Sequence, residues 1–160
     1  MTTEKNEAAA VPTQRKTNSV APAETPPLTR IVSADYVGPK TITNVDLGDP
    51  IGAKILLGSQ GEPDLVPDAI GDGIVEIAYW LVKQVVRTDE QTGEVKISAR
   101  TTLIGPDGVS FGCESSGVIE SLDLIRQVYG DGPYDPPIRC KLASSKTRHG
   151  GRYYYLIAAD

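Results

Sequence analysis

The spacing of the apolar residues changes once in the second half of the chain, and this change constrains the fold more than any other feature. From residue 74, apolar and polar side chains alternate in IVEIAYWLVKQVVR (74–87), EVKISARTTLI (94–104) and the shorter VSFGCE (109–114). A period of two residues predicts half-buried β-strands. The intervening TDEQTG and GPDG are typical of hairpin turns.

The next segment has a helical period. In SSGVIESLDLIRQVYG (115–130), the apolar positions Val118, Leu122, Ile125 and Tyr129 recur at helical spacing. Ser115 or Ser116 is placed to cap the start of a helix, and Gly130 stands where helices often end. After the break DGPYDPP, the segments IRCKLASSK (138–146) and RYYYLIAA (152–159) predict a second hairpin.

The order of these elements is strand, strand, strand, helix, strand, strand. This is the connectivity of an OB-fold, a small and partly open β-barrel. We therefore expect a mostly β protein, built as a small OB-like five-stranded barrel with one helix between strands 3 and 4. The alternative is a sheet with one face covered by the helix and by residues 30–70.

The first part of the chain carries a weaker signal. Residues 1–29 have no aromatic side chain and no apolar periodicity, so we expect a disordered N-terminal tail. Residues 30–70 are dense with Gly, Pro and Asp, although TRIVSADYV and GAKILLG have the composition of short strands. We expect an irregular arm over 30–70, packed within a single OB-like domain that covers 30–160.

Several classes of function have no support in the sequence. Cys113 and Cys140 match no metal-binding spacing, and the single histidine, His149, lies in a glycine-rich turn. No nucleophile constellation, carboxylate pair or phosphate-binding loop is visible, so we expect neither an enzyme nor a cofactor or metal. No apolar run reaches the ~20 residues of a membrane helix, and the N-terminus lacks a secretory signal. We expect a cytoplasmic protein with both cysteines reduced and buried, one in the third strand and one in the fourth.

The charge distribution is more informative than the net charge. A net charge of −5 argues against a general binder of polyanions. Residues 31–70 are acidic, whereas residues 138–159 contain five basic side chains and no acidic one. A surface that is only soluble usually mixes both signs, so the C-terminal hairpin is a candidate site for an anionic ligand.

Basic side chains also occupy outward positions of the predicted strands. Alternation places Lys96 and Arg100 outward in 94–104, and Arg139 and Lys141 outward in 138–146. These four cations would form one charged surface if the strands are neighbours. The alternative is that they are ordinary solvated strand faces.

Trp80 and the tyrosine triplet are candidates for stacking on a ligand. Alternation in 74–87 favours Val75, Ile77, Tyr79, Leu81 and Val85 as the core face. Trp80 would then lie on the opposite face, exposed as a stacking platform or buried beneath residues 30–70. Tyr153 and Tyr155 share one side of their strand with Ile157, and Tyr154 shares the other with Arg152 and Leu156. At least one tyrosine is therefore expected in the core and at least one among the cations.

The last third of the chain resembles a known type of protein. GVSFGCESSGVIESLDLIRQVYGDGPYDPPIRCKLASSKTRHGGRYYYLIAAD (108–160) combines a short strand, a Ser-Gly helix start, a helix, a Gly-Pro-Pro break and a Lys-rich hairpin that closes in RYYYL. This pattern resembles single-stranded DNA-binding or replication-accessory proteins encoded by phages and mobile elements. Many bacterial single-strand binders end in an acidic tip that recruits partners. Here only Asp160 is acidic, so we do not expect that mode of recruitment.

Together these observations predict sequence-independent binding of single-stranded nucleic acid, in replication or recombination of a phage or mobile element. Cations would follow the phosphates and aromatic rings would stack on bases. The candidate residues are Trp80, Lys96, Arg100, Arg139, Lys141, Lys146, Arg148, Arg152, Tyr153, Tyr154 and Tyr155. The alternative is a protein-interaction or assembly module, in which the same aromatic and basic surface is a subunit interface of a homo-oligomer.

Overall fold

The computed structural model describes residues 26–58, 61, 63, 66–67 and 73–159. Its elements are the 3-10 helix η2 (Leu28–Val32), β1 (Thr41–Thr43), α3 (Pro50–Gly58), β2 (Ile74–Ile77), β3 (Tyr79–Thr88), β4 (Val95–Ile104), β5 (Ser110–Cys113), α4 (Ser116–Tyr129), β6 (Ile138–Lys146) and β7 (Arg152–Ala158). Within this part of the chain, seven strands form two antiparallel sheets in the orders β1-β3-β4-β5 and β2-β6-β7. The protein is mixed α/β with a majority of strands, and the helix predicted before the last hairpin is confirmed.

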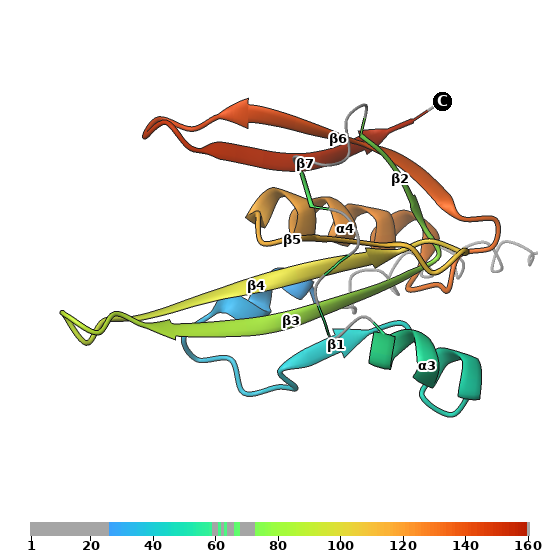
Figure 1. Cartoon of the computed structure of the whole chain (residues 1–160), viewed down its shortest axis with the longest axis horizontal. Helices are drawn as coiled ribbons and strands as arrows, with labels where there is room; N and C mark the ends of the chain where they lie inside the picture. The colour runs from blue at the N-terminus through green and yellow to red at the C-terminus, as the bar shows by residue number, and fades with distance from the viewer. Residues whose placement is uncertain (1–25, 59–60, 62, 64–65, 68–72, 160) are drawn as a thin grey trace, which may run out of the picture.

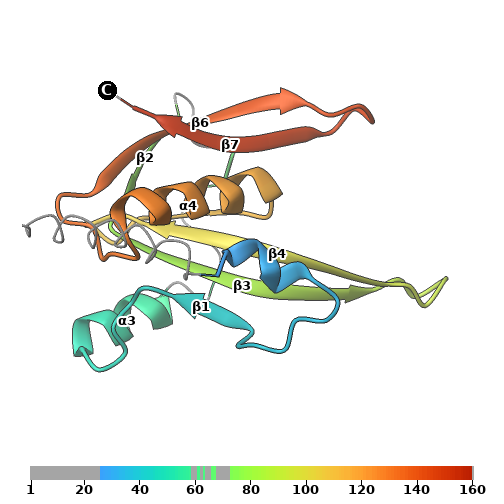
Figure 2. The same ribbon diagram turned by 180° about the vertical axis from the view of Figure 1, so that it is seen from behind.

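Helix α4 lies between the two sheets and forms the centre of the core (Figures 1 and 2). Its buried side chains Val118, Ile119 and Leu122 pack in one cluster with side chains from both sheets, among them Leu103 and Leu156. The inward positions predicted for β4 are confirmed from Ile97 to Leu103, which belong to or approach the core, but Thr102 and Ile104 on the other face are buried as well. The two hairpins β3–β4 and β6–β7 extend beyond the core toward the same side of the molecule (Figures 1 and 2).

A bend at Ala78 passes the chain from one sheet to the other. The Ala78 N–H donates to the Ile104 carbonyl at 2.8 Å, and the Ala78 carbonyl accepts the Tyr134 N–H at 3.0 Å. Before the bend the odd-numbered Ile77 is buried in the core, and after it the even-numbered Trp80 is. The predicted core face of 74–87 is therefore right for β2. In β3 the core cluster takes the even-numbered Trp80 and Val82, because one residue outside the ladder inverts the alternation; of the predicted odd-numbered positions only Leu81 is buried, on the other face of the sheet.

No closed barrel forms among the described residues, because β5 and β7 are not paired. The strand order nevertheless runs without interruption from β5 through β4 and β3 to the bend, and then through β2 and β6 to β7. The free edge of β7 is bound by two serines of the α4 region. The Ser115 hydroxyl accepts the Tyr154 N–H at 3.0 Å and donates to the Tyr154 carbonyl at 2.9 Å. The Ser121 hydroxyl accepts the Leu156 N–H at 3.0 Å.

The ends of α4 follow from these contacts. Ser115 is the N-cap, as predicted, but its hydroxyl binds β7 rather than the first turn of the helix. Gly117 permits the first turn of α4 to lie close to β7, since an added Cβ would lie 2.2 Å from the Tyr154 carbonyl oxygen. Gly130 ends the helix with φ at 81°, and its N–H donates to the Arg126 carbonyl.

The N-terminal arm is more regular than the sequence indicated. TRIVSADYV contains the end of η2 and turns rather than a strand, and GAKILLG lies within helix α3. Leu28 and Ile31 of η2 are buried in the core, so the predicted tail boundary at residue 29 is too late. The rest of the predicted tail, residues 1–25, lies outside the described residues.

Both cysteines are free thiols in the core. Cys113 ends β5 and Cys140 lies in β6, as predicted, and both are buried. Burial raises the pKa of both thiols, that of Cys140 to about 11. Neither thiol is therefore activated as a nucleophile at neutral pH.

Candidate nucleic-acid interface

Four cations lie on the face of the β3–β4 hairpin that is turned away from the core. The strand register places Lys83 opposite Arg100 and Arg87 opposite Lys96, and we call this set the basic face. Like charges directly opposite each other destabilise a strand pair. Fold stability therefore gives no reason for this arrangement, whereas an anionic ligand would.

One carboxylate compensates part of this charge. Glu114, at the end of β5, accepts two hydrogen bonds from Arg87 at 2.8 and 3.0 Å and one from Arg100 at 3.3 Å. The Ser98 hydroxyl lies 3.4 Å from the same carboxylate. The arginines lower the pKa of Glu114 to about 2, chiefly through the hydrogen bonds from Arg87. Glu114 is thus an anion under all ordinary conditions.

A cavity of about 340 Å³ opens beside the basic face, where β5 and β7 are unpaired. We call it the seam cavity; Arg100, Gly112, Glu114, Arg152 and Tyr154 contribute to its walls. Pro63 of the arm packs on Gly112, where an added Cβ would lie 2.8 Å from the proline ring. The cavity is therefore lined by Arg100 of the first sheet and by Arg152 and Tyr154 of the second.

The turn of the β6–β7 hairpin supplies further exposed cations. Lys146 pairs with Arg152 at the end of the ladder, Arg148 lies in the turn between them, and all three side chains are exposed. The Arg152 guanidinium donates to the Ser144 hydroxyl at 3.1 Å, which places it over the strand face that carries Tyr154. We call these three cations the hairpin tip.

Trp80 is not available for stacking. Its side chain is 1% exposed, its indole N–H donates to the Asp131 carbonyl at 3.0 Å, and the Arg126 guanidinium lies 5.3 Å from its ring centroid. The inverted alternation after Ala78 is the reason that it lies in the core. Of the two alternatives left open by the sequence, the buried one is correct.

The tyrosine triplet divides between two faces as predicted. Tyr154 is half-buried against the core, on the same side of β7 as Leu156. Tyr153 and Tyr155 share the other side with ring centroids 6.0 Å apart, and the Tyr153 hydroxyl donates to Glu120 at 2.7 Å. The ring that lies among cations is that of Tyr154, since it lines the seam cavity with Arg100 and Arg152.

The expectation of one surface formed by Lys96, Arg100, Arg139 and Lys141 is wrong. Lys96 and Arg100 lie on β4, which pairs with β3 and β5, whereas Arg139 and Lys141 lie on β6, which pairs with β2 and β7. Arg139 approaches Glu76 of β2 at 3.7 Å. These two cations therefore belong to the other sheet and not to the basic face.

Sequence reasoning missed Lys83 and Arg87. Both occupy odd-numbered positions of 74–87, which were assigned to the core face. Two cations four residues apart on a supposed core face were the signal that the alternation had changed phase.

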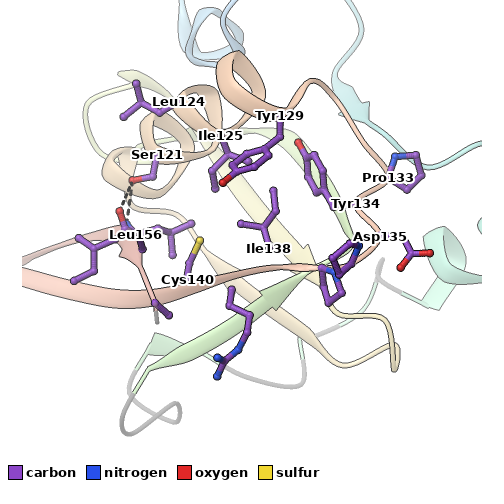
Figure 3. A pocket seen from close by; sticks show the side chains of 16 residues that line it. Ser121, Leu124, Ile125, Tyr129, Pro133, Tyr134, Asp135, Ile138, Cys140 and Leu156 are labelled. Atoms are coloured by element: carbon purple, nitrogen blue, oxygen red, sulfur yellow. Dashed lines mark hydrogen bonds between the residues drawn. The ribbon is translucent and has the colours of Figure 1, made fainter.

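A larger cavity, of about 660 Å³, lies between α4 and the β6–β7 hairpin. Figure 3 shows Ile125, Tyr129, Tyr134 and Ile138 around it, with the Cys140 thiol also in its wall. The walls are mainly apolar side chains, and the cavity lies apart from the basic face and the hairpin tip. It offers space for an apolar group rather than for a phosphate.

The described residues contain no group of three or more His, Cys, Asp or Glu side chains placed to hold a metal ion. None of their helices has the length and apolar character needed to span a membrane. Comparison of the chain with models of protein families, with curated proteins and with solved structures finds no match.

Proposed function

We propose that this protein binds single-stranded DNA without sequence preference, on a surface formed by the basic face, the seam cavity and the hairpin tip. The observation that carries the proposal is that cations lie opposite each other at two places on β3 and β4, Lys83 with Arg100 and Arg87 with Lys96. Arginine and lysine at this spacing suit consecutive backbone phosphates, and binding releases condensed counterions.

The topology supports an opened OB-like arrangement. If β2 and β3 are counted as one bent strand, the order β5-β4-β3/β2-β6-β7 with α4 between β5 and β6 is the OB order. OB-folds bind oligonucleotides on the outer face of their second and third strands and with the loops that join strands 1–2 and 4–5. Here those parts are the β4–β5 face and the turns of the β3–β4 and β6–β7 hairpins. Cations lie on that face and in the β6–β7 turn, whereas the β3–β4 turn carries Asp89, Glu90 and Glu94.

Stacking in this proposal falls to Tyr154 rather than Trp80. Tyr154 lines the seam cavity together with Arg100 and Arg152, and base stacking on an aromatic ring contributes about 1–3 kcal/mol. A role in replication or recombination of a phage or mobile element follows from the resemblance of residues 108–160.

The test measures binding of fluorescently labelled oligo-dT and oligo-dA by anisotropy at several salt concentrations. The label belongs on the oligonucleotide, because buried Trp80 would report binding poorly. The variants K83E/K96E and K146E/R148E should weaken binding to both sequences about equally. Each lost phosphate contact should lower the slope of log affinity against log salt by about 0.7.

A matched control distinguishes this surface from net charge. K54E/K141E removes two exposed lysines, one on α3 and one on the second sheet, and makes the same change in net charge. It should bind nearly as the parent does. Equal loss in the control, or no binding of the parent at low salt, would refute the proposal.

A protein-interaction role has one observation in its favour. Leu124 and Tyr129 of α4 and Ile157 of β7 are exposed apolar side chains that line the larger cavity, with Leu124 63% exposed. Exposed apolar patches mark interaction sites. Sedimentation of the parent and of L124E/I157E would show whether this patch joins two copies of the chain.

A further inference from the structure

The carboxylate of Glu114 sits in a set of donors that would equally suit a phosphate. Arg87 binds it with both terminal nitrogens, Arg100 adds a third nitrogen, and Ser98 adds a hydroxyl. Guanidinium groups bind carboxylate and phosphate with the same bidentate geometry. These donors would therefore bind a phosphate of a ligand as well as they bind the Glu114 carboxylate.

Glu114 is placed to compete with an external phosphate for these donors. Strands β3, β4 and β5 themselves contain no acidic residue, and Glu114 directly follows β5; Asp89 and Glu94 lie further along the hairpin, in the turn beyond Arg87 and Lys96. Its side chain is 29% exposed and that of Arg87 is 58% exposed, so solvent and ligand reach the ion pair. Ion pairs of this exposure contribute little to stability, and an arriving polyanion can displace them.

We infer that Arg87, Ser98 and Arg100 form a phosphate subsite of this surface, and that Glu114 occupies it until a backbone phosphate of the nucleic acid displaces the carboxylate. The inference rests on the proposed function and adds regulation of the same site. Glu114 occupies the donors of both arginines in the free protein and compensates part of their charge, so that a single phosphate gains little there. A polyanion that engages Lys83, Lys96 and the hairpin tip at the same time displaces the carboxylate.

Removing the charge of Glu114 should therefore strengthen binding. Exposed ion pairs are weak, so freeing both arginines should tighten oligo-dT binding about two- to thirtyfold. The slope of log affinity against log salt should become steeper, because the freed arginines hold counterions that binding releases.

The experiment compares the parent, E114Q and E90Q by oligo-dT anisotropy over a range of salt. Glu90 is an exposed residue in the turn of the same hairpin, so E90Q makes the same change in net charge away from the donor set. E114D, with a side chain one methylene shorter, bridges the arginines less well and should bind between the parent and E114Q. Urea unfolding, followed by Trp80 emission, verifies that each variant is folded.

The outcomes separate the two proposals. Tighter binding by E114Q, with E90Q like the parent, supports the subsite. If the parent binds but E114Q binds no more tightly, or if E90Q gains as much as E114Q, the subsite is refuted while the proposed function stands. If neither the parent nor E114Q binds at low salt, the proposed function fails, and the subsite fails with it.

Discussion

Replacing Asp123 with alanine should strongly destabilise the protein. The Asp123 side chain accepts the Leu28 N–H at 2.8 and 2.9 Å and the Thr29 N–H at 3.3 Å, and it pairs with Arg126 at 2.9 Å. The residue is only 8% exposed. It therefore joins helix α4 to the start of η2, whose Leu28 and Ile31 complete the core.

The magnitude follows from what the substitution leaves without a partner. Removing one member of a buried ion pair costs about 3–5 kcal/mol, because the remaining charge stays buried. Arg126 retains its hydrogen bond to Asp131 at 2.8 Å, which argues for the lower end of that range. The loss of acceptors for buried N–H groups at Leu28 and Thr29 acts in the same direction. We expect a decrease of about 3 kcal/mol in the free energy of unfolding.

Urea unfolding followed by the emission of buried Trp80 measures this effect. With a urea dependence of about 2 kcal/mol per molar, the midpoint should fall by about 1.5 M. Glu90→Ala, an exposed turn position, is the control and should change stability by less than about 0.5 kcal/mol. If the two variants shift the midpoint equally, Asp123 does not hold η2 in place and the reasoning is wrong.

Three further expectations concern other parts of the molecule. Removing residues 1–27 should leave the thermal midpoint almost unchanged, whereas removing residues 1–32 also takes two core side chains and should cost at least about 4 kcal/mol, which calorimetry would show. The Cys140 thiol should resist a thiol reagent at pH 8 in the folded protein and react fully in denaturant, since burial raises its pKa to about 11. The pKa of Glu114 is about 2 in the folded protein against a usual 4.5, so its stabilising effect is complete above pH 4.5 and is lost as the pH falls toward 2. Urea midpoints from pH 6 to pH 2.5 should therefore fall less in E114Q than in the parent.

The elements that the sequence predicted well are those in which local pattern and tertiary burial agree. In β4 the alternate side chains from Ile97 to Leu103 face the core, and α4 has apolar residues at helical spacing between a serine and Gly130. The C-terminal hairpin likewise keeps Tyr154 apart from Tyr153 and Tyr155. In each case one face meets the core throughout, so periodicity alone identifies it.

The failures have a different cause, because they depend on contacts between distant segments. The bend at Ala78 is held by Ile104 and Tyr134, far along the chain, and within IVEIAYWLVKQVVR only the cations Lys83 and Arg87 on the supposed core face indicate it. Because this bend inverts the alternation, Trp80 is buried in the core and Lys83 lies on the basic face. η2 is likewise fixed by Asp123, which is 95 residues away from Leu28. Propensity could not indicate an element whose backbone groups are bound by a remote carboxylate.

The open side of the fold and the candidate site have one structural origin. An unpaired strand edge invites association with other chains unless it is covered. Ser115 and Ser121 cover the edge of β7 by binding the backbone of Tyr154 and Leu156, so α4 takes the place that β5 would take in a closed barrel. Because β5 and β7 stay apart, the seam cavity remains open between cations of the two sheets. Pairing of β5 with β7 would fill this space with backbone, and would remove the one place where Tyr154 and the basic face meet.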